Sequence, residues 1–527
     1  MELDHDACYR ALSTRDARFD GRFFAAVRTT GIYCRPICPA RTPKSENVTF
    51  YPSASGAQEA GFRPCLRCRP ESSPDLAAWR GTSNTVARAL ALIGEGALDE
   101  EAVDGLAGRL GVGERQLRRL FKRHLGASPI AVAQTRRVLF AKQLIVETAM
   151  PMAEIALASG FGSIRRFNAT FQALYQRPPR ELRRAGLATA EQTAAEGITL
   201  MLPYAPPYDW EAMIGFLAAR AITGIETVDA DRRYRRSIAL DGAQGTISVE
   251  PDGRAPALRV TIRFPRIASL AAIVRRVRRI FDLSADPLAI AQDLGCDPLL
   301  APLVARRPGL RVPGAWDGFE LAIRAVLGQQ VTITAAAKLA GKLVAAYGDP
   351  LPPGHGDGLT HTFPAPERIA AADLRSLGMP AARAQALASM AGAAAADPRL
   401  FSRTQSLDDA VAKLRALRGI GEWTAQYFAM RVLREPDAFP AQDIGLMRAL
   451  AAPGGERPSA VALLARAEAW RPWRAYAAQH LWTADAATRA ANTRANSKDK
   501  ADAHADPAST ALYRPDRKPD RDNPSHP

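Results

Sequence analysis

The 527-residue sequence has no uninterrupted apolar run long enough to cross a bilayer, and it shows no secretory stretch or lipidation motif. It contains only six cysteines. These absences argue against a membrane-embedded or anchored protein and against a secreted domain held together by disulfides. We therefore expect a cytoplasmic, nucleoid-associated protein in a reducing compartment, without a membrane partner.

Positive charge is what the sequence has in excess. The 70 lysines and arginines outnumber the 54 aspartates and glutamates, which gives a formal net charge of +16. The arginines are spread along the chain, so the pattern favours a polyanionic partner such as double-stranded DNA, with an anionic membrane surface as the rival. The length exceeds what one hydrophobic core supports and indicates three or four domains.

Four of the six cysteines form two close pairs, Cys34 with Cys38 and Cys65 with Cys68. Each pair offers two sulfurs from one turn of chain, and two such turns complete a tetrahedral Zn²⁺ site. A disulfide framework is the alternative, but it disagrees with a reducing compartment. The sequence predicts a zinc-thiolate domain over residues 1–75 with one Zn²⁺ as cofactor, and a purely structural zinc stays open.

The segments that surround these cysteines, at 29–38, 46–50 and 61–68, closely resemble the amino-terminal methyl-sensor domain of the Ada family of bacterial adaptive-response proteins. This resemblance implies that Cys34 accepts a methyl group from a methylphosphotriester in damaged DNA. A zinc-bound thiolate stays deprotonated and nucleophilic at neutral pH. Methylation removes one negative charge from the site, so its repulsion from DNA falls and promoter binding tightens.

From 82 to 184 the apolar residues fall at helical spacing, interrupted by Gly111 and again by Gly160. Two helix-turn-helix units joined by an apolar helix near 139–145 predict one all-α DNA-binding domain. The region resembles the AraC-type regulator domain, and we expect promoter DNA and RNA polymerase as its partners. A solvated helical face is the alternative. The side chains expected to contact DNA are Arg115, Gln116, Arg118, Arg119, Ser163, Arg165, Arg166 and Asn168.

The rest of the chain divides by its composition and periodicity. The predicted segments are a small polar linker at 185–197, an α+β domain at 198–311, an alanine-rich helical domain at 312–485 and a charged, disordered tail at 486–527. The fold class is therefore multidomain and mainly α with α+β parts, beginning with a small zinc α/β domain.

Residues 417–425 match a helix-hairpin-helix signature that contains Gly419 and Gly421. Glycines permit a tight turn whose backbone amides can hold a DNA phosphate at a helix start. Asp443 lies 22 residues beyond Gly421, after a further helical stretch. Tight turns between packed helices also use glycine, so this motif alone is only a fair indication of DNA binding.

The chain resembles AlkA-type 3-methyladenine DNA glycosylases well beyond that motif, from about 202 to 482. The matching segments are 206–210, 215–221, 281–283, 307–311, 325–329, 421–429 and 470–474. The resemblance implies an α+β amino-terminal domain, a helix-hairpin-helix glycosylase domain and hydrolysis of the bond between an alkylated purine and deoxyribose after base flipping. No cofactor is expected for this reaction.

Asp443 is the catalytic residue that the resemblance implies, acting on an oxocarbenium-like sugar or on water. Bifunctional relatives carry a lysine nucleophile about where Gln426 stands, and no lysine occurs between Leu417 and Asp443, so lyase activity is not expected. The expected base pocket contains Trp423, Tyr427 and Trp482, whose faces can stack on a cationic base; each could instead be a core residue. Gln330 stands where the family inserts a leucine wedge.

Two further features bear on function. Arg275, Arg276, Arg278 and Arg279 form either a phosphate patch or, as we favour, a solvated helix face. Cys8 and Cys296 lack the Pro-Cys-His-Arg setting of the alkylguanine methyltransferases, so reversal of O6-methylguanine is not expected. The leading hypothesis is a fused sensor, transcriptional activator and glycosylase. The alternative is a regulator whose glycosylase-like half binds damaged DNA without catalysis.

Overall fold

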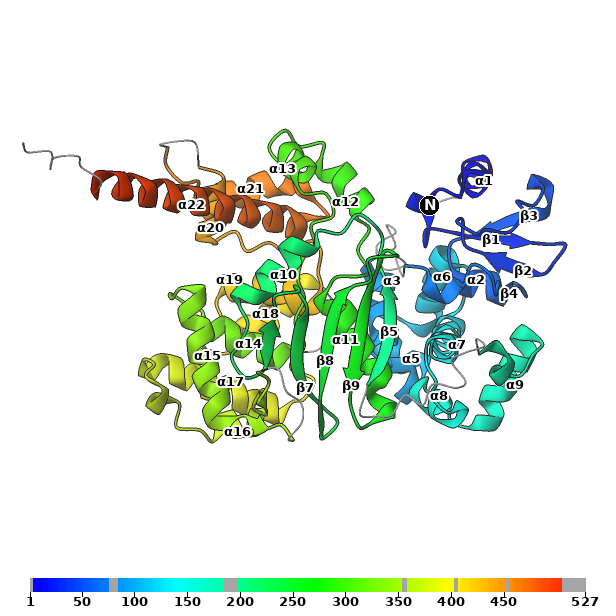
Figure 1. Ribbon diagram of the computed structural model, residues 1–527, viewed down its shortest axis with the longest axis horizontal. Helices are drawn as coiled ribbons and strands as arrows, with labels where there is room; N and C mark the ends of the chain where they lie inside the picture. The colour runs from blue at the N-terminus through cyan, green and yellow to red at the C-terminus, as the bar shows by residue number, and fades with distance from the viewer. Residues whose placement is uncertain are drawn as a thin grey trace, which may run out of the picture.

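The computed structural model describes residues 3–74, 84–183, 197–352, 358–401, 406–451 and 455–504. It confirms a multidomain chain that is mainly helical with α+β parts (Figure 1). Apart from Gly197, the predicted linker lies outside the described residues. Within the part that is described, no helix combines the length and the apolar character needed to cross a bilayer.

The amino-terminal region is a four-stranded sheet flanked by short helices. Its elements are α1 (His5–Thr14), β1 (Phe24–Val27), β2 (Ile32–Cys34), β3 (Val48–Tyr51), α2 (Ala54–Glu59) and β4 (Arg63–Pro64). The strand order is β3-β1-β2-β4, and β2 and β4 pair in parallel with Tyr33 opposite Pro64. Because both strands end at this point, Cys34 and Cys65 leave the sheet side by side, which brings the two cysteine pairs together.

The second region is all helical and contains the two predicted helix-turn-helix units. Its helices are α3 (Asn84–Gly94), α4 (Ala97–Glu100), α5 (Val103–Arg109), α6 (Glu114–Leu125), α7 (Pro129–Glu147), α8 (Met152–Ala158) and α9 (Ile164–Tyr175). Gly111 and Gly160 adopt φ values of +67° and +76° in the turns, a left-handed conformation that side chains disfavour. The 19-residue helix α7 joins the two units.

The third region contains a five-stranded antiparallel sheet with the order β5-β9-β8-β7-β6. Its elements are β5 (Ile198–Pro203), α10 (Trp210–Ala219), β6 (Glu226–Val228), β7 (Tyr234–Leu240), β8 (Ala243–Pro251), β9 (Ala257–Arg263) and α11 (Leu270–Ile280). Helix α11 buries Ile273, Val274 and Val277 in the core that it shares with the sheet. Its alternation of apolar and arginine residues therefore follows the 3.6-residue period of a helix packed on one face.

The helix-turn-helix region packs directly on this sheet, as Figure 1 shows for α7 beside β5. One hydrophobic core contains Val138, Ile155, Phe167 and Phe171 together with Leu200, Val260 and Leu270. At the edge strand β5, Gln143 donates to the Met201 carbonyl at 2.8 Å, and Met201 N–H donates to Glu147 at 3.0 Å. Covering an edge strand in this way satisfies its backbone groups.

The last region is a bundle of helices around the largest core. Its elements are α12 (Pro287–Leu294), α13 (Ala301–Arg306), α14 (Gly318–Leu327), α15 (Ile333–Tyr347), β10 (Asp349–Pro350), β11 (His361–Thr362), α16 (Pro366–Ala370), α17 (Ala381–Ala396), α18 (Leu407–Arg415), α19 (Glu422–Phe428), α20 (Ile444–Ala449), α21 (Ala460–Ala467) and α22 (Arg474–His504). A π-helical turn, Ala429–Leu433, follows α19. Helices α12 and α13, inside the predicted α+β segment, contribute Ile290, Leu294 and Val304 to this helical core.

The end of the chain differs from the sequence-based expectation. Helix α22 continues to His504, although the segment 486–527 was expected to lack structure. Alanine is the best helix former, and the alanine-rich stretch after Trp482 extends a helix that tertiary packing has already started. Residues 505–527 lie outside the described part.

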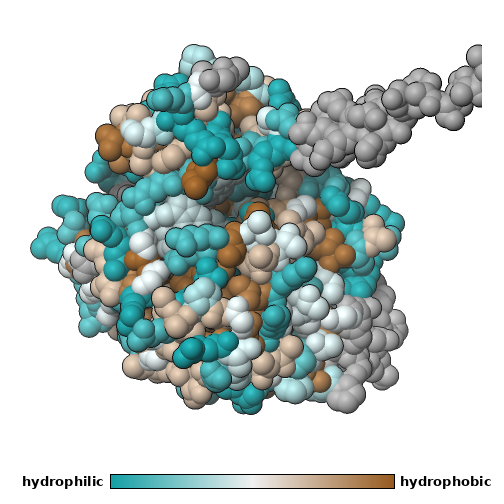
Figure 2. All heavy atoms as spheres, turned by 90° about the vertical axis from the view of Figure 1, so that its left-hand side faces the viewer, coloured by the Kyte–Doolittle hydropathy of each residue, from teal (hydrophilic) through white to brown (hydrophobic). Residues whose placement is uncertain are grey.

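Seen from the side of the helical bundle, the surface mixes hydrophilic and hydrophobic residues around a recess (Figure 2).

Candidate functional sites

Asp443 is held between two indole rings. Trp423 Nε1 donates to Asp443 Oδ2 at 2.8 Å, and Trp482 Nε1 donates to Oδ1 at the same distance. The side chain also caps α20, because Leu446 N–H donates to Oδ1 at 3.0 Å. Three N–H donors to one half-buried carboxyl group fix its orientation. The structure therefore presents Asp443 as an oriented carboxyl group.

The predicted aromatic residues gather around this carboxylate. Trp423 and Tyr427 lie four residues apart on α19, which places both on one helical face, and their rings stack at 5.1 Å between centroids. Trp482 reaches the same place from α22 and meets Tyr427 edge-on at 6.2 Å. All three rings are half-buried. The predicted catalytic residue and the three predicted pocket residues thus form one cluster.

Gln330 lies in the turn between α14 and α15, on the exposed surface. It adopts φ of +57°, which is uncommon for a residue with a side chain. Its neighbour Gln329 donates to the Gly419 carbonyl at 2.8 Å, and Arg383 donates to the Gln329 carbonyl at 2.6 Å. This turn is therefore fastened to the helix-hairpin-helix motif, and the exposed apolar side chain of Val331 follows it.

The two signature glycines lie exposed at the start of α19. Gly419 adopts φ of +87°, and a Cβ there would lie 2.7 Å from the Ala386 Cβ, so both conformation and space require glycine. Ile420 between them is buried. Gly421 is the N-cap residue of α19. The hairpin is built as the motif predicts, and its backbone is accessible from solvent.

The sequence did not predict a column of alternating arginine and aromatic side chains that lies behind the pocket and consists of Arg220, Phe216, Arg431 and Tyr427. The Arg431 guanidinium lies 4.5 Å from the Phe216 ring and 5.2 Å from the Tyr427 ring, and it donates to the Tyr427 hydroxyl. The Arg220 guanidinium lies 3.8 Å from the same Phe216 ring. Burial lowers the pKa of Arg431 to about 10. Phe216 and Arg220 belong to the segment 215–221 that matches the glycosylase family, whereas Arg431 lies in the π turn.

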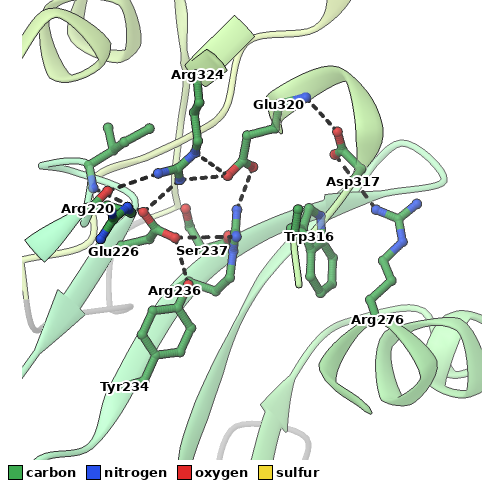
Figure 3. Close-up of polar contacts among 12 residues, drawn as sticks. Arg220, Glu226, Tyr234, Arg236, Ser237, Arg276, Trp316, Asp317, Glu320 and Arg324 are labelled. Atoms are coloured by element: carbon green, nitrogen blue, oxygen red, sulfur yellow. Dashed lines mark hydrogen bonds and ion pairs between the residues drawn. The ribbon is translucent and has the colours of Figure 1, made fainter. Parts of the chain in front are cut away.

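A buried charge network beneath this column joins the sheet to α14 (Figure 3). Glu320 accepts from Arg236 at 2.7 Å and from Arg324 at 2.9 Å, and Arg324 also bonds Glu226 at 2.6 Å. Burial alone would raise the pKa of Glu320, but the two guanidinium groups outweigh it and lower the pKa to about 2. Arg324 also donates to the Arg220 carbonyl at 3.0 Å, so the network fixes the backbone that carries the column.

The four predicted cysteine ligands converge as expected. Their Sγ atoms all lie within 4.8 Å of one another. Tetrahedral zinc with Zn–S bonds of about 2.3 Å needs sulfurs about 3.8 Å apart, so the cluster fits one Zn²⁺ ion. Cys34 ends β2 and Cys65 follows β4, which is the side-by-side arrangement that the parallel strand pair creates. Cys34, Cys38, Cys65 and Cys68 therefore form a zinc-binding site.

The four sulfurs differ in their surroundings. Cys34 is half-buried, whereas Cys38, Cys65 and Cys68 are buried. Cys68 Sγ accepts the backbone N–H of Arg35 at 3.3 Å, a hydrogen bond that stabilises a thiolate and makes it a weaker nucleophile. The Arg35 side chain in turn pairs with Asp20 and donates to the Cys68 carbonyl at 3.1 Å, which fixes this loop. Cys34 is thus the one residue of the four that is not fully buried.

The side chains expected to contact promoter DNA are exposed in both helix-turn-helix units. Helix α6 carries Arg115, Gln116, Arg118 and Arg119, while α9 carries Arg165, Arg166 and Asn168 after the N-cap Ser163. Arg118 pairs with Glu114 one turn earlier at 2.6 Å. Both helices bury only their apolar faces, so their polar faces are available to a partner.

The arginine group on α11 has a role that the sequence did not predict. Arg275 donates to the Glu95 carbonyl of the helix-turn-helix region at 3.3 Å, and Arg279 donates to the Ala315 carbonyl at 3.2 Å. Arg276 stacks over Trp316 at 4.9 Å. These half-buried side chains hold regions of the protein together, so α11 is not a simple solvated face.

Cys8 is buried, which raises its pKa to about 11.

Four family models match the chain in the order of the regions described above. They are the metal binding domain of Ada over 7–71, a helix-turn-helix domain over 106–185, the AlkA N-terminal domain over 199–317 and the HhH-GPD superfamily of base excision DNA repair proteins over 323–475. Together with the geometry, these matches define a class: a zinc-binding, DNA-binding regulator joined to a helix-hairpin-helix DNA glycosylase.

A relative that matches almost the whole chain makes the assignment more specific. The probable bifunctional transcriptional activator/DNA repair enzyme AlkA of Mycobacterium tuberculosis is 44% identical over 489 residues, which cover 92% of this chain and 97% of that protein. The chain belongs to this family of bifunctional transcriptional activator/DNA repair enzymes, and the predicted fusion is confirmed.

Two further relatives match different parts of the chain. DNA-3-methyladenine glycosylase 2 of Escherichia coli is 38% identical over 286 residues, covering 53% of this chain and 95% of its own length. The bifunctional transcriptional activator/DNA repair enzyme Ada of the same organism is 40% identical over 138 residues, covering 26% of this chain and 37% of its own.

Proposed function

We propose that this protein senses methylated DNA phosphates through Cys34, activates transcription through its helix-turn-helix region, and excises alkylated purines such as 3-methyladenine with Asp443. The observation that carries the excision activity is the placement of Asp443 between the indole N–H groups of Trp423 and Trp482, beside the Tyr427 ring. An oriented carboxylate next to aromatic faces provides a negative charge and a stacking surface in one place.

The excision step follows from the charge of the substrate. Alkylation at N3 or N7 makes the purine cationic, so the electron pair of the N-glycosidic bond leaves with the base and neutralises it. Positive charge then develops on the sugar, where the Asp443 carboxylate stabilises it. Water forms the new bond to C1′, and its proton passes through Asp443 to solvent. No lysine lies between Leu417 and Asp443, so the reaction stops at hydrolysis, and it needs no cofactor.

The proposed contacts with DNA are divided between the turn and the hairpin. Gly419 and Gly421 present backbone N–H groups to a phosphate, while Gln330 fills the gap that the flipped nucleotide leaves. The hydrogen bond from Gln329 to the Gly419 carbonyl supports this proposal, because it keeps the two contacts at a fixed spacing. Stacking on Trp423 and Tyr427 then favours a cationic base over a neutral one.

Methyl transfer to Cys34 is the second proposed reaction. The Cys34 sulfur attacks the methyl carbon of a methylphosphotriester; the S–C bond forms, the C–O bond breaks, and the phosphate leaves as an anionic diester. Bound zinc keeps the thiolate deprotonated at neutral pH. Cys34 is half-buried, whereas the other three ligands are fully buried, and this difference supports Cys34 as the acceptor.

Transfer of the methyl group changes the charge of the sensor. Four thiolates around Zn²⁺ carry a net charge near −2, and a thioether at Cys34 reduces it to about −1. Repulsion from DNA phosphates falls, so promoter affinity rises with a salt-dependent component. The exposed residues Arg115, Gln116, Arg118, Arg119, Arg165 and Arg166 then hold the promoter, and RNA polymerase is the proposed partner of the activated protein.

Base release from methylated duplex DNA tests this proposal. Wild-type protein is expected to release 3-methyladenine and 7-methylguanine, and Asp443→Asn is expected to release neither at a measurable rate. Asparagine preserves size and the N-cap role but removes the charge, so a folded, inactive variant isolates the electrostatic contribution. A wild-type protein that binds this DNA without releasing bases would instead be a regulator with a non-catalytic glycosylase half.

A further inference from the structure

A buried ion pair connects the helix-turn-helix region to the helical bundle that carries the base pocket. Arg88 on α3 donates from Nε to Glu435 Oε1 at 3.0 Å and from Nη2 to Oε2 at 3.1 Å. The two side chains are only 7% and 10% exposed, although 347 residues separate them in the sequence. A two-bond pair of this kind fixes the carboxylate in both distance and orientation.

Glu435 closes the π-helical turn that follows α19. Its backbone N–H donates to the Ala429 carbonyl at 3.0 Å, across the whole turn Ala429–Leu433. Arg434, immediately before it, adopts φ of +57° and donates to the Val312 carbonyl at 2.8 Å. A π-helical turn is rare, occurs mostly as a single turn next to an α-helix, and is frequent at functional sites.

The turn that Glu435 closes carries Arg431. This guanidinium donates to the Tyr427 hydroxyl and lies between the Tyr427 and Phe216 rings. Arg431 is buried, and its other hydrogen bond goes to the Gly314 carbonyl at 3.1 Å. Arg431 follows Tyr427 by four residues, a spacing at which two side chains share one helical face, so a shift at the end of the turn changes how the guanidinium meets the ring.

From this connection we infer that Arg88 is a positioning residue of the base pocket, supplied by the regulator half of the chain. It holds Glu435, Glu435 holds the end of the π turn, and the turn holds Arg431 against Tyr427. The inference rests on the proposed excision activity. It adds that the helix-turn-helix region completes the glycosylase pocket from behind, so the two halves do not work as independent modules.

The test uses the full-length protein and single-turnover excision of 7-methylguanine from a methylated duplex. Arg88→Met and Glu435→Gln are expected to lower the excision rate constant roughly tenfold or more, because small displacements in a catalytic site are costly. Binding to a duplex with a stable abasic-site analogue is expected to change less than about twofold, since the exposed contacts remain. The double variant Arg88→Met/Glu435→Gln should be no slower than either single variant.

A matched control is Arg22→Met, which breaks another ion pair between distant regions, Arg22 with Asp286 at 2.6 Å, without touching the π turn. Its rate constant is expected to equal that of wild type. Arg88→Lys, which keeps the charge and loses the two-bond geometry, should give an intermediate rate constant. If Arg88→Met does not fold, the Glu435→Gln and Arg88→Lys rate constants decide.

Two results would overturn the inference. One is a wild-type excision rate constant in the folded Arg88 and Glu435 variants. The other is a smaller amount of base released in the single turnover with an unchanged rate constant, which marks a merely structural role. A wild-type protein that releases no base defeats the proposed function itself, and this outcome differs from an active wild type whose Arg88 variants are equally fast.

Discussion

Trp423 Nε1 donates a hydrogen bond to Asp443 Oδ2 at 2.8 Å. The indole comes from the first turn of the helix after the hairpin, and the carboxyl group comes from the N-cap of α20, so one bond links the helix-hairpin-helix motif to the proposed catalytic residue. We therefore expect a shift of the hairpin on bound DNA to change the position of Asp443.

The second indole bond provides a test of orientation. In Trp482→Phe an aromatic face remains, but the donor to Asp443 Oδ1 is lost, and we expect the single-turnover excision rate constant to fall roughly tenfold because hydrogen bonds to charged groups contribute about 1.5–3 kcal/mol. Trp473→Phe is the matched control, since it removes an indole bond of 2.6 Å to Asp293 outside the pocket. Equal losses in both variants would contradict the assigned role.

We expect Gln330 to enter the base stack, and removing its amide from water then costs free energy. In Gln330→Leu that cost disappears, so affinity for a duplex with an abasic-site analogue should rise by about fivefold. Gln330→Gly suits the φ of +57° but removes the wedge, and its affinity should fall. Fluorescence anisotropy measures both. A glycine variant that binds as tightly as wild type would show that Gln330 does not enter the DNA.

Zinc removal should separate the two activities. The amino-terminal apolar clusters are small, one of them comprising Phe24, Ala26, Tyr33 and Ala57, so we expect a strong chelator to unfold the 7–71 region and abolish methyl uptake. Base release should persist, because Tyr427 and Trp482 beside Asp443 pack against a different core. Limited proteolysis and zinc analysis follow the change, and Cys296→Ser, at an exposed cysteine, serves as a control. Loss of both activities on chelation would contradict this separation.

His480 makes stability depend on pH. Burial lowers its pKa from 6.5 to about 4; Asp209 opposes this shift and Arg307 adds to it, both with smaller effects. The unfolded chain therefore binds a proton below about pH 6.5 that the folded protein takes up only below about pH 4, so stability falls as pH drops through this window. Between pH 7.5 and 5 the loss is about 2 kcal/mol. Urea unfolding should show it in wild type, and His480→Gln should lack this component.

The sequence predicted the features that follow from motifs and spacing. The cysteine pairs converge, Trp423 and Tyr427 share a helical face, and Asp443 meets them because the hairpin glycines and the following helix fix the path of the chain. These relationships are either local in the sequence or lie within segments that match a known family. For that reason they can be seen without coordinates.

The relationships that depend on long-range packing could not be predicted. The pair of Arg88 with Glu435 spans 347 positions, and the shared core of α7 with β5 involves residues whose periodicity indicates only a buried face. The arginines of α11 resembled a solvated face because periodicity does not reveal which neighbour covers a helix. Helix α22 continued past 485 because alanine propensity extends a packed helix, a tendency that a low apolar content conceals.

The most direct test of the central claim uses one methylated duplex that carries both N-alkylpurines and methylphosphotriesters. Base release and the mass of the Cys34 peptide are measured on the same sample. We expect wild-type protein to release 3-methyladenine and to gain one methyl group on Cys34, and Asp443→Asn to gain the methyl group while releasing no base. Release by Asp443→Asn at the wild-type rate, or a methyl group on another cysteine, would contradict the account.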